Sequence, residues 1–292
     1  AAAAAAAAAE KEATIDSNLL LGSLHRRGHL HVAGYYNCPR LWGSPTADLL
    51  RRAREKSGCS TSLNAQFDAT GEWAHLAGSV LPFVDVMFVS ADEAAHISGI
   101  FPKSDDSDTN GGANEYTVRA AHWFLDHGCS VAVVTLGKHG ALALFCDETP
   151  ELACRTQSQN GAASSGADNA GNSPPRTLLV QPVREGSIEA VDTTGGGDAF
   201  NSGFLFGWRC GGGGGVSGNH EDDGGGGSFR EADPETPWHV SASSVAEGLR
   251  WGVAVGTACV GFMGASTPMD MNEVRKFLPE QHLPLESRQS AP

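Results

Sequence analysis

The chain has 292 residues, of which 40% are hydrophobic, so it is long enough to form one large domain or two small ones with a substantial core. Its net charge of −14 argues against DNA, RNA and anionic membranes as partners, because those surfaces select proteins that carry a basic face. The 7 cysteines are an odd number with no C-x-x-C pair, which indicates reduced, intracellular thiols rather than disulfides or a zinc site.

Residues 1–28 open with a run of alanines and are predicted to be a low-complexity, poorly ordered lead. The first predicted helix spans 44–58 and has clear end signals. Ser44 is its expected N-cap, Pro45 suits its first turn, and Gly58 is expected to end it.

Strand-like and helix-like segments alternate along the rest of the chain. Strands are predicted over 29–36, 59–65, 84–90, 130–137, 140–146 and 177–183, and helices over 71–83, 91–99, 115–128, 199–208 and 239–262. This alternation predicts an α/β fold, a mostly parallel sheet with helices on both faces. Two low-complexity stretches, 155–176 and 211–236, are predicted to be flexible insertions between elements. We therefore expect one domain over 29–280 and a tail over 281–292.

Polar side chains gather at the end of the strand predicted over 59–65. Asn64, Gln66 and Asp68 lie at or just beyond this end. Ligands of open α/β folds bind at the carboxyl ends of parallel strands. Asn64 is therefore a candidate for a functional role.

Three consecutive glycines, Gly195 to Gly197, stand directly before Asp198 at the start of an apolar, helix-like segment. Glycines at a helix N-terminus let the backbone approach a phosphate and aim amide N–H groups at it. A carboxylate there repels a bound phosphate, but it suits a base that takes the proton of an attacking hydroxyl. The residues alone leave two interpretations open: phosphoryl-transfer chemistry, or a glycine-rich turn in which Asp198 caps the helix.

The stretch VDTTGGGDAFNSGF, residues 191–204, resembles the D-T-x-G-A-G-D motif of the ribokinase/PfkB-type carbohydrate kinase family, with Gly196 in place of the usual alanine. Two further stretches agree in order and spacing. VDVMFVSADEAAHISG resembles the family's strand followed by N-x-x-E, and VAVVTLGKHGALAL resembles its T-x-G-x-x-G hairpin. The resemblance covers roughly residues 29–280 and implies a ribokinase-like, three-layer α/β/α sandwich.

The resemblance also implies roles for the residues of the glycine turn. Asp198 would be the catalytic base that acts on the acceptor hydroxyl. Gly195, Gly196 and Gly197 would form the anion hole for the transferred phosphoryl group.

The other residues that the resemblance carries over face ATP and metal ions. Those of the ATP site are Ser90, Thr135, Gly137 and Gly140. Glu93 would help to position Mg²⁺ through water. Asp192 and the carbonyl oxygen of Thr194 match positions that would bind a monovalent cation such as K⁺.

One position departs from the family pattern. Ser90 stands where N-x-x-E has asparagine, and serine is shorter and lacks the amide. The metal and phosphate contacts of this position are therefore in question. An alternative is that Ser90 and Glu93 form a capping box at a helix start, and both roles can coexist.

The resemblance implies a kinase that uses ATP and Mg²⁺ to phosphorylate a hydroxyl of a sugar or nucleoside in the cytoplasm or an organelle. One alternative is a kinase-like protein that binds nucleotide or a partner without catalysis; another is an unrelated α/β nucleotide-binding domain. The family's N-terminal part supplies the first strands, a glycine-pair substrate motif and a β-lid, and residues 1–28 resemble none of these. We therefore expect an N-terminally truncated domain that is itself inactive, and a homodimer only where a longer protein supplies the lid.

Overall fold

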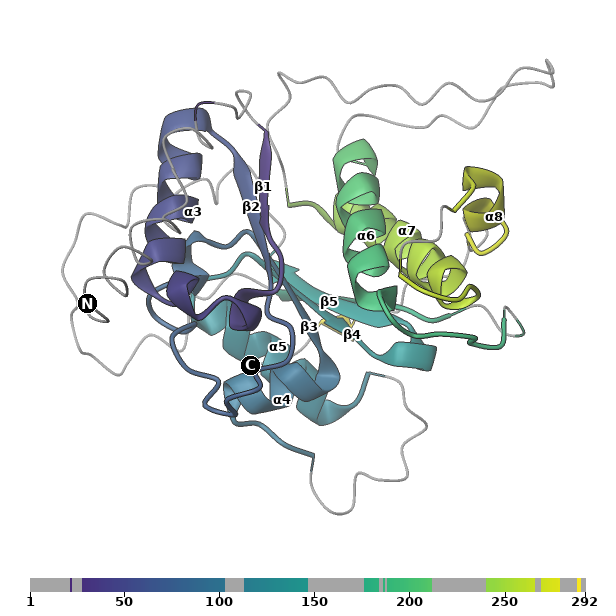
Figure 1. Ribbon diagram of the computed structural model, residues 1–292, viewed down its shortest axis with the longest axis horizontal. Coiled ribbons are helices and arrows are strands. Elements are labelled where there is room, and N and C mark those ends of the chain that lie inside the picture. The colour runs from purple at the N-terminus through teal and green to yellow at the C-terminus, as the bar shows by residue number, and fades with distance from the viewer. Residues whose placement is uncertain are drawn as a thin grey trace, which may run out of the picture.

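The computed structural model describes residues 22, 28–102, 113–146, 176–183, 186, 188–211, 240–265, 269–278 and 288–289. The predicted lead over 1–28, the insertions over 155–176 and 211–236 and the tail over 281–292 lie almost entirely outside these residues, and those predictions stay untested. Within the described part, the chain forms one seven-stranded sheet with helices on both of its faces (Figure 1).

The strands of the sheet lie side by side in the order in which they follow along the chain. They are β1 (His29–Val32), β2 (Ser60–Asn64), β3 (Val86–Ser90), β4 (Val131–Thr135), β5 (Ala141–Cys146), β6 (Arg176–Gln181) and β7 (Arg288–Gln289). The pairs from β1 to β4 are parallel, and the pairs from β4 to β7 are antiparallel. The predicted parallel arrangement therefore holds for the first four strands, and the hairpin of β4 and β5 begins the antiparallel part.

The helices divide between the two faces of the sheet. They are α3 (Ser44–Ser57), α4 (Ala91–Ser98), α5 (Glu115–Asp126), α6 (Gly196–Gly211), α7 (Ala242–Val260) and the short α8 (Met271–Arg275). In Figure 1, α3, α4 and α5 cover one face, and α6 and α7 cover the other. The three-layer α/β/α fold that the sequence predicts is confirmed.

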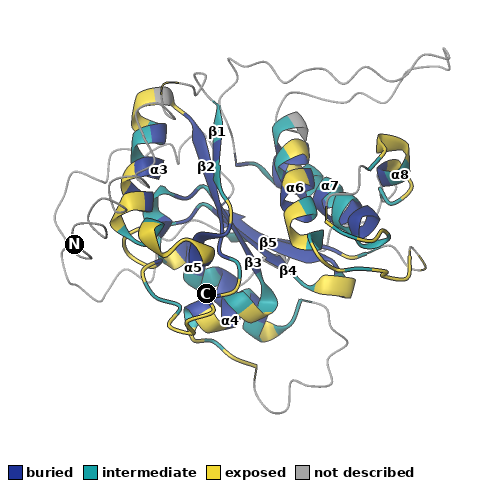
Figure 2. Cartoon of the chain, in the orientation of Figure 1, coloured by how far each residue is buried: buried dark blue, intermediate teal, exposed yellow. Residues whose placement is uncertain are grey.

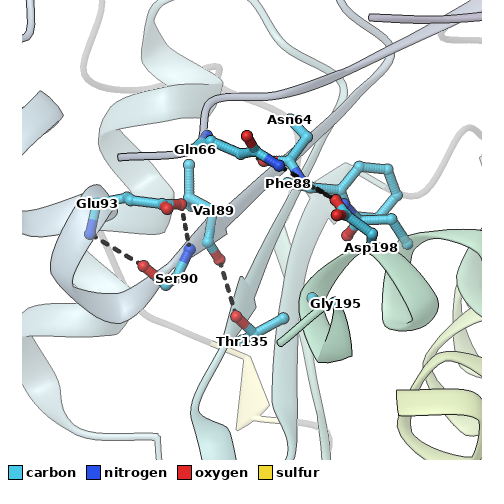
Figure 3. A pocket seen from close by; sticks show the side chains of 11 residues that line it. Asn64, Gln66, Phe88, Val89, Ser90, Glu93, Thr135, Gly195 and Asp198 are labelled. Atoms are coloured by element: carbon cyan, nitrogen blue, oxygen red, sulfur yellow. Dashed lines mark hydrogen bonds between the residues drawn. The ribbon is translucent and has the colours of Figure 1, made fainter. Parts of the chain in front are cut away.

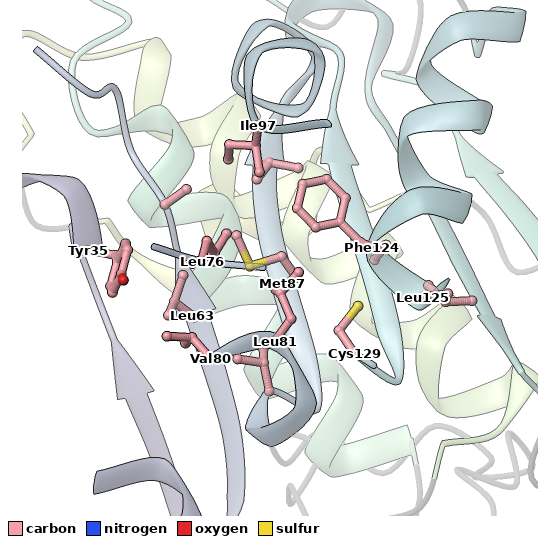
Figure 4. Packing of buried hydrophobic residues seen from close by; sticks show 14 of the residues in the cluster. Tyr35, Leu63, Leu76, Val80, Leu81, Met87, Ile97, Phe124, Leu125 and Cys129 are labelled. Atoms are coloured by element: carbon pink, nitrogen blue, oxygen red, sulfur yellow. The ribbon is translucent and has the colours of Figure 1, made fainter. Parts of the chain in front are cut away.

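The sheet divides the core into two clusters of buried side chains, one on each face. Figure 2 colours the buried residues of the strands and helices dark blue. Successive residues of a strand point to opposite faces. Met87 therefore packs with Phe124 under α5, as Figure 4 shows, whereas Phe88 packs with Phe204 under α6. The strands of the centre are buried on both faces, which explains why their sequences are continuous apolar runs.

The start of α3 differs from the prediction by one residue. Gly43, at φ +68°, is the N-cap, and Ser44 is already the first helical residue. The Tyr35 hydroxyl accepts a hydrogen bond from the Gly43 N–H at 2.7 Å, so a tertiary contact holds the residue that precedes the helix. Gly58 ends the helix in the left-handed conformation, as predicted.

The prediction of a helix over 71–83 is wrong. The segment is a series of turns, and only Leu81–Phe83 forms a single turn of 3-10 helix. The Asp68 carboxylate accepts hydrogen bonds from the N–H groups of Thr70 and Trp73, both at 2.8 Å, and this competes with helical hydrogen bonding. Trp73 itself adopts φ +50°, and its ring stacks on His96 with centroids 5.0 Å apart.

A polar cluster lines β1 and β2 on the face that α6 covers. The His29 ring bonds through Nδ1 to the Ser60 hydroxyl and through Nε2 to the Ser62 hydroxyl, both at 2.7 Å. Burial, aided by the charges of His31 and Arg209, lowers the pKa of His29 to about 3. His29 is therefore neutral in the folded protein at every pH above that value.

This predicts a loss of stability in mild acid. Between pH 6.5 and pH 3 the unfolded chain binds a proton at His29 that the folded protein does not, so the free energy of unfolding falls as the pH is lowered through this window. Urea unfolding at pH 7 and pH 4.5 should show that the wild type loses about 2 to 3 kcal/mol more than His29→Gln, which has no titrating group there. Equal losses in the two proteins would contradict the assignment.

Candidate active site

A cavity of about 210 Å³ opens at the carboxyl ends of the parallel strands, beside the N-terminus of α6 (Figure 3). Asn64, Ser90 and Thr135 are the last residues of β2, β3 and β4, and all three line it. Because parallel strands end at the same edge of a sheet, side chains far apart in the sequence meet here. The cavity therefore unites four of the predicted site elements: the strand-end polar residues, Ser90 with Glu93, Thr135 and the glycine turn.

The glycine turn has a conformation and a packing that require glycine at its first position. Gly195 has φ +78°, and a Cβ there would lie 2.5 Å from the Cβ of Ala265. A Cβ at Gly196 would lie 2.9 Å from a methyl carbon of Val260, whereas one at Gly197 would meet nothing within 4 Å. Gly195 and Gly197 line the cavity and Gly196 does not, so the turn presents open backbone to the cavity and packs its other side on the end of α7.

Asp198 lies in the first turn of α6, which begins at Gly196. Asp198 is therefore inside the helix. The alternative interpretation required it to be the N-cap, and it is not. Its Oδ1 accepts hydrogen bonds from Asn64 Nδ2 at 3.4 Å and from Gln66 Nε2 at 3.3 Å. The side chain is exposed and faces the cavity (Figure 3).

Ser90 and Glu93 form the predicted capping box at the start of α4. The Ser90 hydroxyl accepts from the Glu93 N–H at 3.2 Å, and Glu93 Oε2 accepts from the Ser90 N–H at 2.9 Å. Burial is the main cause that raises the pKa of Glu93, and the nearby carboxylates of Asp92 and Asp198 add to it. Both residues also line the cavity, so capping does not remove Glu93 from the site.

Of the T-x-G-x-x-G residues of the hairpin between β4 and β5, only Thr135 lines the cavity. The Thr135 hydroxyl donates to the carbonyl oxygen of Val89 at 3.5 Å. Gly137 and Gly140 lie further along the hairpin and are not among the residues that line the cavity. Gly140 has φ +91°, and a Cβ there would lie 2.0 Å from the carbonyl oxygen of Gln181, which explains why this position is glycine.

Asp192 ties the glycine turn to the segment after α7. Its Oδ1 accepts from the Thr194 N–H and its Oδ2 accepts from the Gly264 N–H, both at 2.9 Å. The hydrogen bonds to Thr194, with that to Gly264, hold the pKa of Asp192 below its usual range. Neither Asp192 nor Thr194 lines the cavity. The two hydrogen bonds give Asp192 a structural role, and the expected role in binding a monovalent cation stays a prediction.

Asn201 is a residue of the cavity that the sequence analysis missed. It lies three positions after Asp198 on α6, and only 4% of its surface is exposed. Its Nδ2 finds no hydrogen-bond partner among the described residues. The spacing of one helical turn from Asp198 is the signal that could have identified it.

Comparisons with known proteins agree with this geometry. A model of the pfkB family carbohydrate kinases matches residues 1–213. No curated protein matches the chain. Among the described residues, no helix is long and apolar enough to span a bilayer.

Solved structures share the fold at low sequence identity. Arabidopsis thaliana ribokinase, complexed with ribose and ATP, is 17% identical with a TM-score of 0.51, and the match covers 90% of this chain and 58% of that one. Aminoimidazole riboside kinase from Salmonella enterica is also 17% identical with a TM-score of 0.51, over 87% of this chain and 63% of that one. The chain thus spans about six tenths of the length of these proteins, and at this identity the likeness shows the ribokinase-like fold alone.

Proposed function

The chain belongs to the pfkB family of carbohydrate kinases. From that premise we propose that it carries the base and the phosphoryl-binding turn of an ATP-dependent kinase. The reaction would move the γ-phosphoryl group of ATP to a hydroxyl of a sugar or nucleoside. The observation that carries the proposal is the meeting of Asp198 with the open glycine backbone in one cavity. A base and an anion site side by side are what phosphoryl transfer requires of a protein.

Asp198 would act on the acceptor. We assign Oδ2 to the acceptor hydroxyl, because Oδ1 already accepts from Asn64 and Gln66. As the new O–P bond forms and the bond to ADP breaks, the hydroxyl proton passes to the carboxylate, which later releases it to water.

The glycine turn would act on the phosphoryl group. The first N–H groups of a helix have no intrahelical acceptor, and the positive end of the helix dipole lies with them. Gly195 and Gly197 place this end of α6 on the cavity without side chains in the way. Such fixed dipoles stabilise the charge that develops in the transition state.

Mg²⁺ fits the residues present only as an ion shared with the substrate. Among the described residues, no three His, Cys, Asp or Glu side chains gather as a metal site. Mg²⁺ typically takes one or two carboxylates, and phosphate oxygens and water complete its shell. Glu93 would hold it through water, and the ion would neutralise charge on the phosphates; Asp192 and Thr194 remain our proposal for K⁺.

The names of two structural relatives support a proposal for the substrate class. The Arabidopsis ribokinase was solved with ribose and ATP, and the Salmonella enterica protein is a riboside kinase. We propose the same class, a ribose-type sugar or a nucleoside, for this chain.

A second candidate function is nucleotide binding without catalysis. It is favoured by the closed capping box, because Glu93 Oε2 is engaged by the Ser90 N–H instead of facing a metal shell. The intact glycine turn with Asp198 favours the kinase.

Acceptor-dependent release of ADP from ATP and Mg²⁺ tests the proposal. Ribose, fructose and adenosine form the first panel, and Asp198→Asn is run beside the wild type. Release with one acceptor that is lost in the variant supports the kinase and names its substrate. Nucleotide binding without release by any acceptor, on this chain and on an N-terminally extended protein, supports the second candidate.

Asn201 gives a separate prediction that joins stability to function. We expect Asn201→Leu, which keeps the branched arrangement of the side-chain heavy atoms, to stabilise the free protein by about 1 kcal/mol, because it removes a buried amide nitrogen that has no partner among the described residues. The same change should lower kcat/KM roughly tenfold, the worth of one hydrogen bond to a bound substrate. Urea unfolding and steady-state kinetics measure the two effects. A destabilised variant with unchanged kinetics would show that Asn201 has a purely structural role.

A further inference from the structure

The side chain of Asp198 is contacted by two side-chain amides, Asn64 at the end of β2 and Gln66 in the loop that follows. Asp198 is exposed at the start of α6, and an exposed carboxylate is free to rotate unless contacts fix it. Asn64 Nδ2 and Gln66 Nε2 both point to its Oδ1, at 3.4 and 3.3 Å (Figure 3). Both donors meet the same oxygen of this cavity-lining residue, so neither bond occupies Oδ2.

The direction of each amide follows from a partner at its other end. An amide side chain has a donor end and an acceptor end, so fixing one end sets the other. Asn64 Oδ1 accepts from the backbone N–H of Gln66 at 3.0 Å. Gln66 Oε1 accepts from Asn37 Nδ2 at 2.5 Å. The nitrogen of each amide is therefore the end that meets Asp198.

The backbone around this contact is shaped to hold it. Gln66 has φ +55°, a conformation that non-glycine residues rarely adopt and that often marks functional sites. Gly34 lies beside the pair, and a Cβ there would come within 3.1 Å of Gln66 Oε1. The Tyr36 N–H donates to the carbonyl oxygen of Ala65 at 3.0 Å, which joins the segment of Asn37 to the segment of Gln66.

We propose that Asn37 is a positioning residue which acts on Asp198 through the side chain of Gln66. Asn37 lies in the 3-10 helix Tyr35–Asn37, is exposed, and is not among the residues that line the cavity. Its effect on the reaction rests on the proposed function, in which Asp198 is the base. It does not depend on which sugar or nucleoside is the acceptor.

Two substitutions that add a negative charge at nearly constant shape test the chain of contacts. Gln66→Glu keeps the acceptor for Asn37 but places a carboxylate oxygen against Asp198. Asn37→Asp accepts from Gln66 Nε2, which would turn Gln66 Oε1 toward Asp198. We expect either change to lower kcat roughly 10- to 100-fold, because a misplaced reacting group loses rate of this order. KM for ATP should change less than about twofold, since neither residue belongs to the glycine turn or to the other positions assigned to ATP.

Two controls separate positioning from general damage. Asn114→Asp makes the same chemical change at the N-cap of α5, where asparagine and aspartate serve equally, and should leave kcat unchanged. Asn37→Ala should lower kcat in the wild type but add nothing in a Gln66→Ala background, because Asn37 acts only through Gln66. Additive losses would overturn the proposal.

A readout that needs no turnover separates this proposal from the proposed function. The side-chain amide signals of Gln66 in a ¹⁵N spectrum should shift on Asp198→Ala and again on Asn37→Asp, and should not shift on Asn114→Asp. If the Gln66 signals do not shift on either Asp198→Ala or Asn37→Asp, the proposed chain of contacts is overturned. Shifts together with unchanged kcat in an active enzyme overturn its catalytic effect. Shifts in a protein that releases no ADP with any acceptor would count against the proposed function and leave the contacts supported.

Discussion

Asp198→Asn is expected to lower kcat by about 10²- to 10⁴-fold while the affinity for ATP stays close to that of the wild type. Asparagine has the shape of aspartate and can still accept from Asn64 and Gln66 through its Oδ1, so the first turn of α6 should keep its structure. It cannot take the proton of the acceptor hydroxyl. Steady-state kinetics with the acceptor found in the panel and calorimetric titration with ATP measure the two quantities.

The matched control for this prediction is Asp92→Asn. Asp92 is exposed in the first turn of α4, next to the Glu93 that lines the cavity, so the variant changes the same amount of charge near the site. It should keep kcat within about twofold. Comparable turnover in Asp198→Asn and the wild type would remove Asp198 from the role of base.

Gly140→Ala is expected to destabilise the protein by about 3 to 5 kcal/mol, the sum of an unfavourable backbone conformation and an overpacked contact. Gly140 has φ +91°, and an added Cβ would lie 2.0 Å from the carbonyl oxygen of Gln181 and 2.8 Å from the Cα of Pro182. Both are backbone atoms at the end of β6, so relief requires the sheet itself to move. This is a large share of the 5–15 kcal/mol that typically stabilises a domain. Urea unfolding measures it.

Gly137→Ala is the control in the same hairpin. Gly137 also has positive φ, +56°, but a Cβ there would meet nothing within 4 Å. Only the conformational cost remains, and we expect a loss of about 1 to 2 kcal/mol. If the two variants lose equal stability, the close approach of β6 to Gly140 is not what requires glycine there.

The elements that local patterns specify could be predicted from the sequence. Continuous apolar runs mark the buried strands, and the glycine that ends α4 has the left-handed conformation expected of a C-cap, at Gly99. The glycine turn was found because three glycines before an aspartate are unusual in any helix start. The rule that ligands bind at the carboxyl ends of parallel strands made Asn64 a candidate, and Asn64 lines the cavity.

The parts that failed depend on contacts between distant segments. The apolar residues of 71–83 suggested a helix, but the Asp68 carboxylate and the packing of Trp73 on His96 fold the segment into turns. The N-cap of α3 is Gly43 rather than Ser44, and Gly43 is held by a bond to the distant side chain of Tyr35. Neither contact has a signature in the local sequence.

The same limit applies to the site. Asn64 and Asp198 lie 134 positions apart, so only the folded chain shows which oxygen of Asp198 is held. The bond between Asn37 and Gln66 and the unpartnered amide nitrogen of Asn201, seen within the described part of the chain, likewise need the tertiary structure. The sequence could name Asp198 as the candidate base, and the structure adds the two amides that contact it.

The hydrogen bond between Asp192 and Gly264 can form only after the ribosome has added Gly264, later than the residues of the glycine turn. The two residues are 72 positions apart, and the family match ends at residue 213, before the second of them. At about 5–20 residues per second, a ribosome needs roughly 4 to 14 seconds to add that stretch. During this interval the nascent chain already contains every residue of the glycine turn but lacks the amide that anchors it. On the proposed function, in which this turn binds the phosphoryl group of ATP, nucleotide affinity should therefore arise late in translation, after the segment that follows α7 has emerged.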